Sequence, residues 1–160
     1  MTIECVAINA SPLITLYRAN LHTLLPQLFP EILVPEAVWV EVVSSSTHED
    51  PAARGLPGAS WAKKTSVSNR LEVQAWNLGA GETALLSLAF ANRAMKVIID
   101  DRAARRCANV FGISAMGTAG VVVMAKRRGL IPSIEQALRQ LQASGLWVSE
   151  TLISELAVND

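Results

Sequence analysis

Residues 95–102 read MKVIIDDR, a short apolar run that ends abruptly at two adjacent aspartates. Val97, Ile98 and Ile99 are β-branched and typical of a buried strand. Asp100 and Asp101 then place two negative charges side by side at its end. At about 5 Å such charges repel by roughly 3 kcal/mol at the effective dielectric of a partly buried site. We therefore expect either open water or a cation at this point of the fold.

The size and composition of the chain indicate one domain. It has 160 residues, is 51% hydrophobic and carries a formal net charge of zero. A single domain over residues 1–160 can bury a sufficient core without disulfides or a structural metal. Cys5 and Cys107 are far apart, and the first eight residues lack a basic leader, so we expect a reduced, cytoplasmic protein. No apolar run approaches the roughly 20 residues of a membrane span, and the charge balance argues against a globally basic nucleic-acid binder.

Strand-like and helix-like segments alternate along the chain. The expected strands are 3–8, 32–34, 97–99 and 113–116, with 61–67 either an edge strand or irregular. The expected helices are a segment from Pro12 capped by Ser11, then 21–29, 35–43, 81–92, 102–111, 118–128, 132–144 and 149–158. This alternation predicts an α/β fold, a three-layer α/β/α sandwich with a central parallel sheet of four to five strands. Ligands are expected beyond the carboxyl ends of the strands.

Two segments depart from this alternation. Residues 44–60 are rich in Ser, Pro and Gly, which predicts a long mobile loop. From about residue 132 the chain continues as a helical C-terminal tail.

Four acidic residues and one amide stand where solvent is not the simplest explanation. Glu41 shares a helix face with apolar neighbours, Glu82 begins a helix on an apolar face, and Asn9 ends the first strand. Parallel topology would bring these three to the same sheet edge as Asp100 and Asp101. A set of ligands containing oxygen alone, without His or Cys, suits Mg²⁺ or Mn²⁺. Such ions commonly act on phosphate esters.

Each of these residues also has a structural explanation when taken alone. Glu82 favours the helix dipole at a helix start, and Glu41 can pair with an arginine. Adjacent aspartates such as Asp100 and Asp101 often end a strand in a turn.

A second hypothesis comes from Gly79-Ala80-Gly81, which opens a G-x-G-x-x-A pattern. With Asp100 or Asp101 about 20 residues further on, this pattern is typical of a dinucleotide-binding site. Residues 69–78 are a poor buried strand, however, and Glu82 places a negative charge where pyrophosphate would bind.

Six stretches taken in order resemble the PIN-domain-like family, in the group of predicted nucleic-acid-binding proteins related to PIN-type toxins. They are NASPLITLYR, VPEAVWVEV, LGAGETALLSLA, VIIDDRAARRCA, GTAGVVVMAKRRGLI and LQASGLWVSETLI. The resemblance implies a metal-dependent ribonuclease that uses Mg²⁺ or Mn²⁺ and, in many members, serves as the toxin of a toxin–antitoxin pair. It implies catalytic and metal-binding roles for Asn9, Glu41, Glu82 and Asp101, with Asp100 adjacent.

The resemblance also implies auxiliary roles and partners. Ser11 or Thr118 would orient the attacking water. Arg102, Arg105 and Lys126 would hold the RNA backbone or else form solvated helix faces. The expected partners are RNA, a small antitoxin and a second copy of the chain, with the dimer surface around Trp147. Asn9 replaces the usual aspartate of the family, so a catalytically degenerate domain that binds nucleic acid or protein is the alternative.

Overall fold

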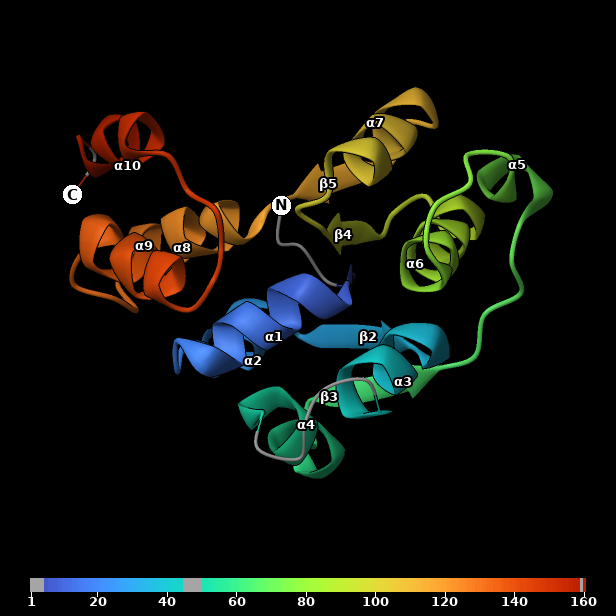
Figure 1. Ribbon diagram of the computed structural model, residues 1–160, viewed down its shortest axis with the longest axis horizontal. Coiled ribbons are helices and arrows are strands. Elements are labelled where there is room, and N and C mark those ends of the chain that lie inside the picture. Colours follow the sequence, from blue (N-terminus) through green and yellow to red (C-terminus); the bar gives the residue numbers. More distant parts are fainter. Residues whose placement is uncertain (1–4, 45–49, 159) are drawn as a thin grey trace.

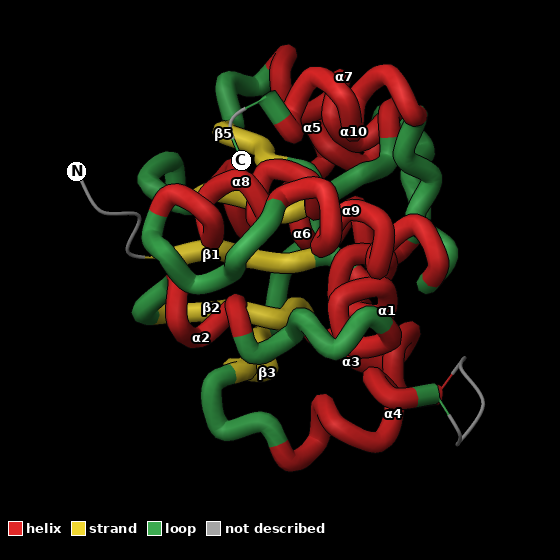
Figure 2. The backbone as a smooth tube through the Cα atoms, turned by 90° about the vertical axis from the view of Figure 1, so that its left-hand side faces the viewer, coloured by secondary structure: helices red, strands yellow, loops and turns green. Residues whose placement is uncertain are grey.

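The computed structural model describes residues 5–44, 50–158 and 160. Its described residues form a five-stranded sheet in which all neighbouring strands are parallel (Figure 1). The strands are β1 (Cys5–Ile8), β2 (Glu31–Pro35), β3 (Ala62–Thr65), β4 (Lys96–Ile98) and β5 (Ser114–Met116). Their order across the sheet is β3-β2-β1-β4-β5. Figure 2 shows them stacked, with β5 near the top and β3 at the bottom.

The strand order creates a switch point between β1 and β4. The chain winds outward from β1 to β2 and β3, then returns to the other side of β1 and continues through β4 to β5. Ile8 at the end of β1 is in register with Ile98 at the end of β4. In open α/β sheets ligands bind where the winding reverses, beyond the carboxyl ends of the strands. Here that place lies between the residues that follow Ile8 and Ile98.

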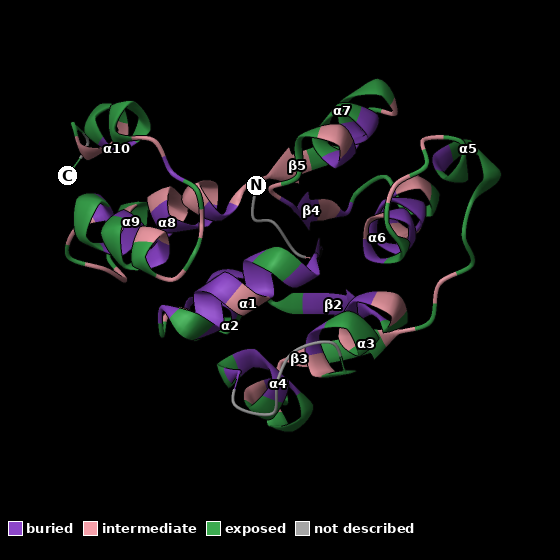
Figure 3. Ribbon diagram, viewed as in Figure 1, coloured by how far each residue is buried: buried purple, intermediate pink, exposed green. Residues whose placement is uncertain are grey.

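Helices connect the strands and cover both faces of the sheet. The helices are α1 (Ala10–Arg18), α2 (Leu24–Leu28), α3 (Glu36–Ser44), α4 (Pro51–Gly55), the 3₁₀ turn η1 (Leu56–Gly58), α5 (Leu71–Gln74), α6 (Ala80–Ala91), α7 (Arg102–Val110), α8 (Thr118–Arg127), α9 (Ile134–Ala143) and α10 (Glu150–Ala157). Figure 3 shows β2 and β4 largely buried and α10 mostly exposed. No described helix is long and apolar enough to cross a membrane.

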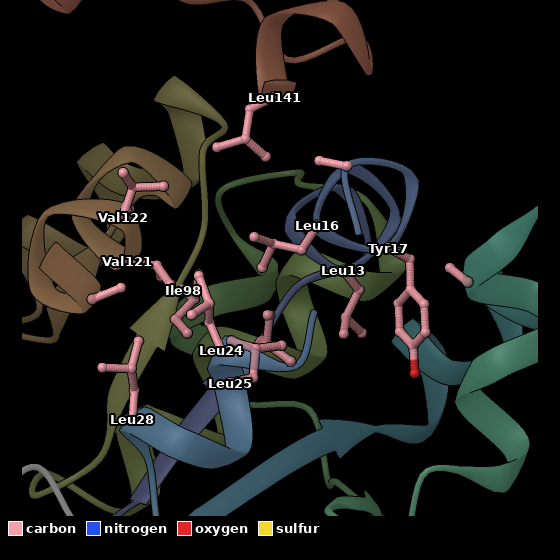
Figure 4. Packing of buried hydrophobic residues seen from close by; sticks show 14 of the residues in the cluster. Leu13, Leu16, Tyr17, Leu24, Leu25, Leu28, Ile98, Val121, Val122 and Leu141 are labelled. Carbon is pink, nitrogen blue, oxygen red and sulfur yellow. The ribbon is translucent and has the colours of Figure 1, made fainter. Parts of the chain in front are cut away.

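Successive side chains of each strand point to opposite faces, which gives two separate cores. Ile8 and Ile98 pack with α1, α2, α8 and α9 on one face. Ala7 and Val97 pack with α6 and α7 on the other. Figure 4 shows the first core, where Leu13, Leu16, Leu24, Leu25, Leu28, Val121, Val122 and Leu141 gather near Ile98. The predicted three-layer α/β/α sandwich is confirmed.

The expectation that residues 44–60 form a loop is wrong for residues 51–58, which form α4 and η1. Asp50 caps α4 by accepting a hydrogen bond from the N–H of Ala52 at 3.0 Å, and Pro51 occupies the first helical position. Ala52 and Leu56 are fully buried. Asp50 also accepts hydrogen bonds from Nη2 and Nε of Arg18 at 2.6 and 3.0 Å. Residues 45–49 lie outside the described part of the chain.

The first helix begins earlier than the sequence suggested. Asn9, with extended backbone angles, is the N-cap, and Ser11 and Pro12 lie within the first turn. The prediction that Ser11 caps this helix is therefore wrong. Pro12 is tolerated because the N–H groups of a first helical turn have no partner within the helix.

Candidate active site

Asn9 occupies the switch point itself. It directly follows β1, and its backbone N–H donates to the carbonyl of Ile98 at 3.0 Å, which ties it to the end of β4. Its side chain is buried, with 4% exposure, yet Oδ1 has no hydrogen-bond partner among the described residues. A buried polar atom without a partner is costly, by about 1–3 kcal/mol, and is rare in folded proteins. The amide oxygen is therefore available to a ligand.

The adjacent aspartates diverge toward two helix N-termini. Asp101 caps α7, with Oδ2 accepting from the N–H of Ala104 at 2.9 Å. Asp100 turns to α8, where Oδ1 accepts from the N–H of Thr118 at 2.9 Å and Oδ2 accepts from its hydroxyl at 2.6 Å. We expected open water or a cation to accommodate both charges. The structure shows a further arrangement, in which each carboxylate accepts hydrogen bonds at the N-terminus of a different helix. The partial positive charge at each helix start stabilises one carboxylate.

Glu82 and Glu41 approach the same region from α6 and α3. Both Oε1 of Glu41 and Oδ1 of Asn9 lie next to Gly81, at 3.1 and 3.4 Å from the position that a Cβ would occupy there. Because Gly81 has no side chain, the first turn of α6 fits against both oxygens. Glu82 is half-buried, but a large part of Glu41 is exposed, so the expectation that Glu41 lies on a buried face is wrong. Partial burial, followed by the negative charge of Glu82, raises the pKa of Glu41.

These residues surround one hollow. A cavity of about 370 Å³ is lined by Asn9, Ser11, Glu82, Asp100, Asp101 and the segment 145–147. Its volume falls within the roughly 300–1,000 Å³ range of small-molecule sites. Four of the five residues expected at the metal site thus share a cavity, and Glu41 lies beside it across Gly81. No pattern in the sequence predicted that residues 145–147, from the link between α9 and α10, would complete the wall of this cavity.

The other residues expected at the site lie at different distances from the cavity. Ser11 lines it, and Thr118 is fully buried and holds Asp100. Arg105 lies close, since its Nη1 donates to the carbonyl of Ile99 at 3.3 Å. Arg102 is exposed at the start of α7. Lys126 is at the last turn of α8. Its Nζ donates to the carbonyl of Pro132 at 2.8 Å, so its ammonium group is bound to the helical C-terminal tail.

The residues present fit a divalent cation with few protein ligands. The donors are hard oxygens, the amide oxygen of Asn9 lacks a partner, and the charges of Glu41 and Glu82 repel each other. Within the described residues, no three His, Cys, Asp or Glu side chains are close enough together to hold one ion. Mg²⁺ is usually bound by one or two carboxylates and retains several waters. Asn9 with one or two of the carboxylates matches that requirement.

The dinucleotide-binding hypothesis is wrong. Such a site requires a strand to run directly into the glycine-rich turn. Residues 75–79 before α6 contain no strand, and the element that precedes them is the short helix α5. The carboxylate of Glu82 lies against Gly79, where Oε2 is 2.7 Å from the position of a Cβ. That charge would repel a pyrophosphate.

The parallel sheet of order 3-2-1-4-5 defines a doubly wound α/β domain, and acidic side chains line the cavity at its switch point. The family model of the PIN domain, DUF3368, matches residues 5–159, and the chain belongs to this family. No curated protein shows significant sequence similarity to the chain. Membership of a PIN family indicates a nuclease-like function and binding of nucleic acid.

Proposed function

We propose that this protein is a Mg²⁺- or Mn²⁺-dependent endoribonuclease that serves as the toxin of a toxin–antitoxin pair. The observation that supports it most directly is the unpartnered, buried Oδ1 of Asn9 beside Glu82, Asp100 and Asp101 in one cavity. An oxygen set of this kind binds a hard cation. The family relationship supports the nucleic-acid substrate.

Different residues of the chain would bind the cation, orient the water and position the site. Asn9 would hold the cation together with one or two of the carboxylates of Glu82, Asp101 and Glu41. When bound, a divalent ion lowers the pKa of its water and stabilises charge on the transferring phosphorus. Ser11 lines the cavity at an exposed position, so its hydroxyl can orient that water. Asp100 is committed to Thr118 and keeps the start of α8 in place, which makes it a positioning residue.

The proposal is tested by cleavage of single-stranded RNA in Mn²⁺. Asp101→Asn suits this test, because asparagine also caps helices and preserves the start of α7 while it removes the charge. We expect Asp101→Asn and Glu82→Gln to lose most of the activity. Glu155→Gln, at an exposed position of α10, is the matched control and should cleave as wild type does. Equal cleavage by all four proteins would refute the site.

A binding module is the second candidate function. The amide of Asn9 brings no charge to the cation, and both aspartates already accept hydrogen bonds from helix N-termini. Wild-type protein that binds RNA in Mn²⁺ but leaves it intact would support this candidate.

The toxin role is tested by expression in a bacterial host, where wild type should arrest growth and Glu82→Gln should not.

A further inference from the structure

Trp147 stands at the wall of the acidic cavity, with its side chain in solvent. It lies in the link between α9 and α10, which Figure 1 shows bending toward α1. It is 81% exposed, yet it lines the same cavity as Asn9, Glu82, Asp100 and Asp101. An exposed tryptophan beside a polar cavity places a large apolar surface where a ligand would bind.

The backbone on both sides of Trp147 is anchored. Leu146 is half-buried against the core and its N–H donates to the carbonyl of Leu141 at 3.0 Å. Val148 is buried, and its carbonyl accepts from Nε2 of Gln142 at 3.0 Å. Gly145 precedes them with φ +107°, a conformation that favours glycine and turns the chain out of α9. The backbone at Trp147 is therefore held in place by its neighbours before any ligand binds.

From this arrangement we infer that Trp147 stacks on a nucleobase of the RNA next to the phosphate held in the cavity. The inference rests on the proposed nuclease function. Phosphate groups of RNA can approach the carboxylates of the cavity only through a bound cation, whereas a base presents an uncharged aromatic face that can contact the indole directly. Stacking of bases on aromatic side chains is a common mode of single-strand recognition. The substrate class is accordingly single-stranded RNA, because a duplex keeps its bases stacked on one another.

A second copy of the chain is a different occupant for the same surface. A partner packed on Trp147 would cover a residue that lines the cavity with Asn9 and Asp101. The open cavity therefore favours the nucleobase over the expected dimer contact at this residue. Light scattering distinguishes the two occupants. A wild-type dimer that becomes a monomer on Trp147→Ala would overturn the inference.

The main experiment measures RNA binding without cleavage. Asp101→Asn protein is titrated in Mn²⁺ with a short single-stranded oligoribonucleotide and followed by fluorescence anisotropy. We expect Trp147→Ala in this background to weaken binding roughly 5- to 100-fold, the effect of losing one stacked base. Trp147→Phe should retain most of the affinity. Leu71→Ala, which removes a side chain that is 79% exposed and does not line the cavity, should bind unchanged.

A double-mutant cycle identifies the stacked base. Each nucleotide of the oligonucleotide is replaced in turn by an abasic one. At one position the loss should match that of Trp147→Ala, and the two changes together should cost no more than either alone. Fully additive losses at every position would refute the stacking contact. Wild type that cleaves RNA while Trp147→Ala binds and cleaves it equally would refute the inference and leave the nuclease proposal intact. If neither the wild-type protein nor Trp147→Ala binds RNA, the nuclease proposal is refuted, and the inference with it.

Discussion

Asp100 and Thr118 form a pair that joins the end of β4 to the start of α8 by two hydrogen bonds, 2.9 Å from the backbone N–H and 2.6 Å from the hydroxyl. Thr118 is fully buried. Because the acceptor is a carboxylate, each bond is stronger than one between neutral groups. The pair fixes one wall of the acidic cavity.

Removing the hydroxyl of Thr118 should therefore destabilise the protein. We expect Thr118→Val to lower the free energy of unfolding by about 1.5–3 kcal/mol, the usual contribution of a hydrogen bond to a charged group. Urea denaturation measures the change. Thr118→Ser keeps the hydroxyl and removes one methyl group, so it should lose only about 1 kcal/mol. If the serine variant were as unstable as the valine variant, the hydroxyl would not be the source of the stability.

Glu41 should make the metal-free protein less stable as pH rises. Its pKa is raised from the ordinary 4.5 by partial burial and then by Glu82, so the folded state disfavours the charged form. The folded state consequently binds more protons than the unfolded state between 4.5 and the raised pKa, and stability falls with increasing pH across that window. In EDTA we expect Glu41→Gln to melt higher than wild type at pH 7, with the difference closing below pH 4.5.

Two controls accompany this measurement. Glu155→Gln on α10 should leave the dependence of the melting temperature on pH as in wild type. Addition of Mn²⁺ should stabilise wild type more than Glu41→Gln, because the variant lacks one candidate ligand. Melting curves of Glu41→Gln and wild type that stay parallel over the whole pH range would contradict the prediction.

Replacing Asn9 by aspartate should have opposite effects without and with metal. In EDTA the new charge adds to the repulsion among the carboxylates, so Asn9→Asp should melt lower than wild type. In Mn²⁺ the same charge attracts the cation, so the variant should gain more stability than wild type and cleave RNA faster. Thermal melts with a Mn²⁺ titration test both parts. Identical melting temperatures and titrations for the two proteins would remove Asn9 from the site.

Gly81→Ala should disturb the site more than the fold. A Cβ there would lie 3.1 Å from Oε1 of Glu41, which must shift by a few tenths of an ångström, and 3.4 Å from Oδ1 of Asn9, which is at the limit of ordinary contact. Alanine favours a helix over glycine by up to about 1 kcal/mol, which offsets part of the crowding. We expect weaker Mn²⁺ binding, measured by calorimetry, with a change in stability below about 1 kcal/mol. Gly58→Ala, where nothing lies within 4 Å of a new Cβ, should change neither quantity.

Much of the fold could be predicted from local patterns along the sequence. The β-branched run at 97–99 and the helix signals around Gly81 and Arg102 reflect interactions within a few residues, and the structure confirms those elements. Segment 51–58 begins with one such local signal, Asp50 followed by Pro51, but it has no helical pattern of apolar residues to support that signal. Its composition is that of a loop, and burial of Ala52 and Leu56 against α1 and α3 gives it a helical structure.

The sequence by itself determined which oxygens the chain has available and that parallel topology would place them at one sheet edge. Tertiary structure alone decided which hydrogen-bond partners and which exposure these oxygens have. It directed Asp100 and Asp101 to two different helices, left Oδ1 of Asn9 buried without a partner, and kept Glu41 exposed at the rim. It also brought Trp147 to the cavity from the far end of the chain. Hydrogen-bond partners and cavity walls depend on contacts between distant segments, and the order of residues along the chain does not specify those contacts locally.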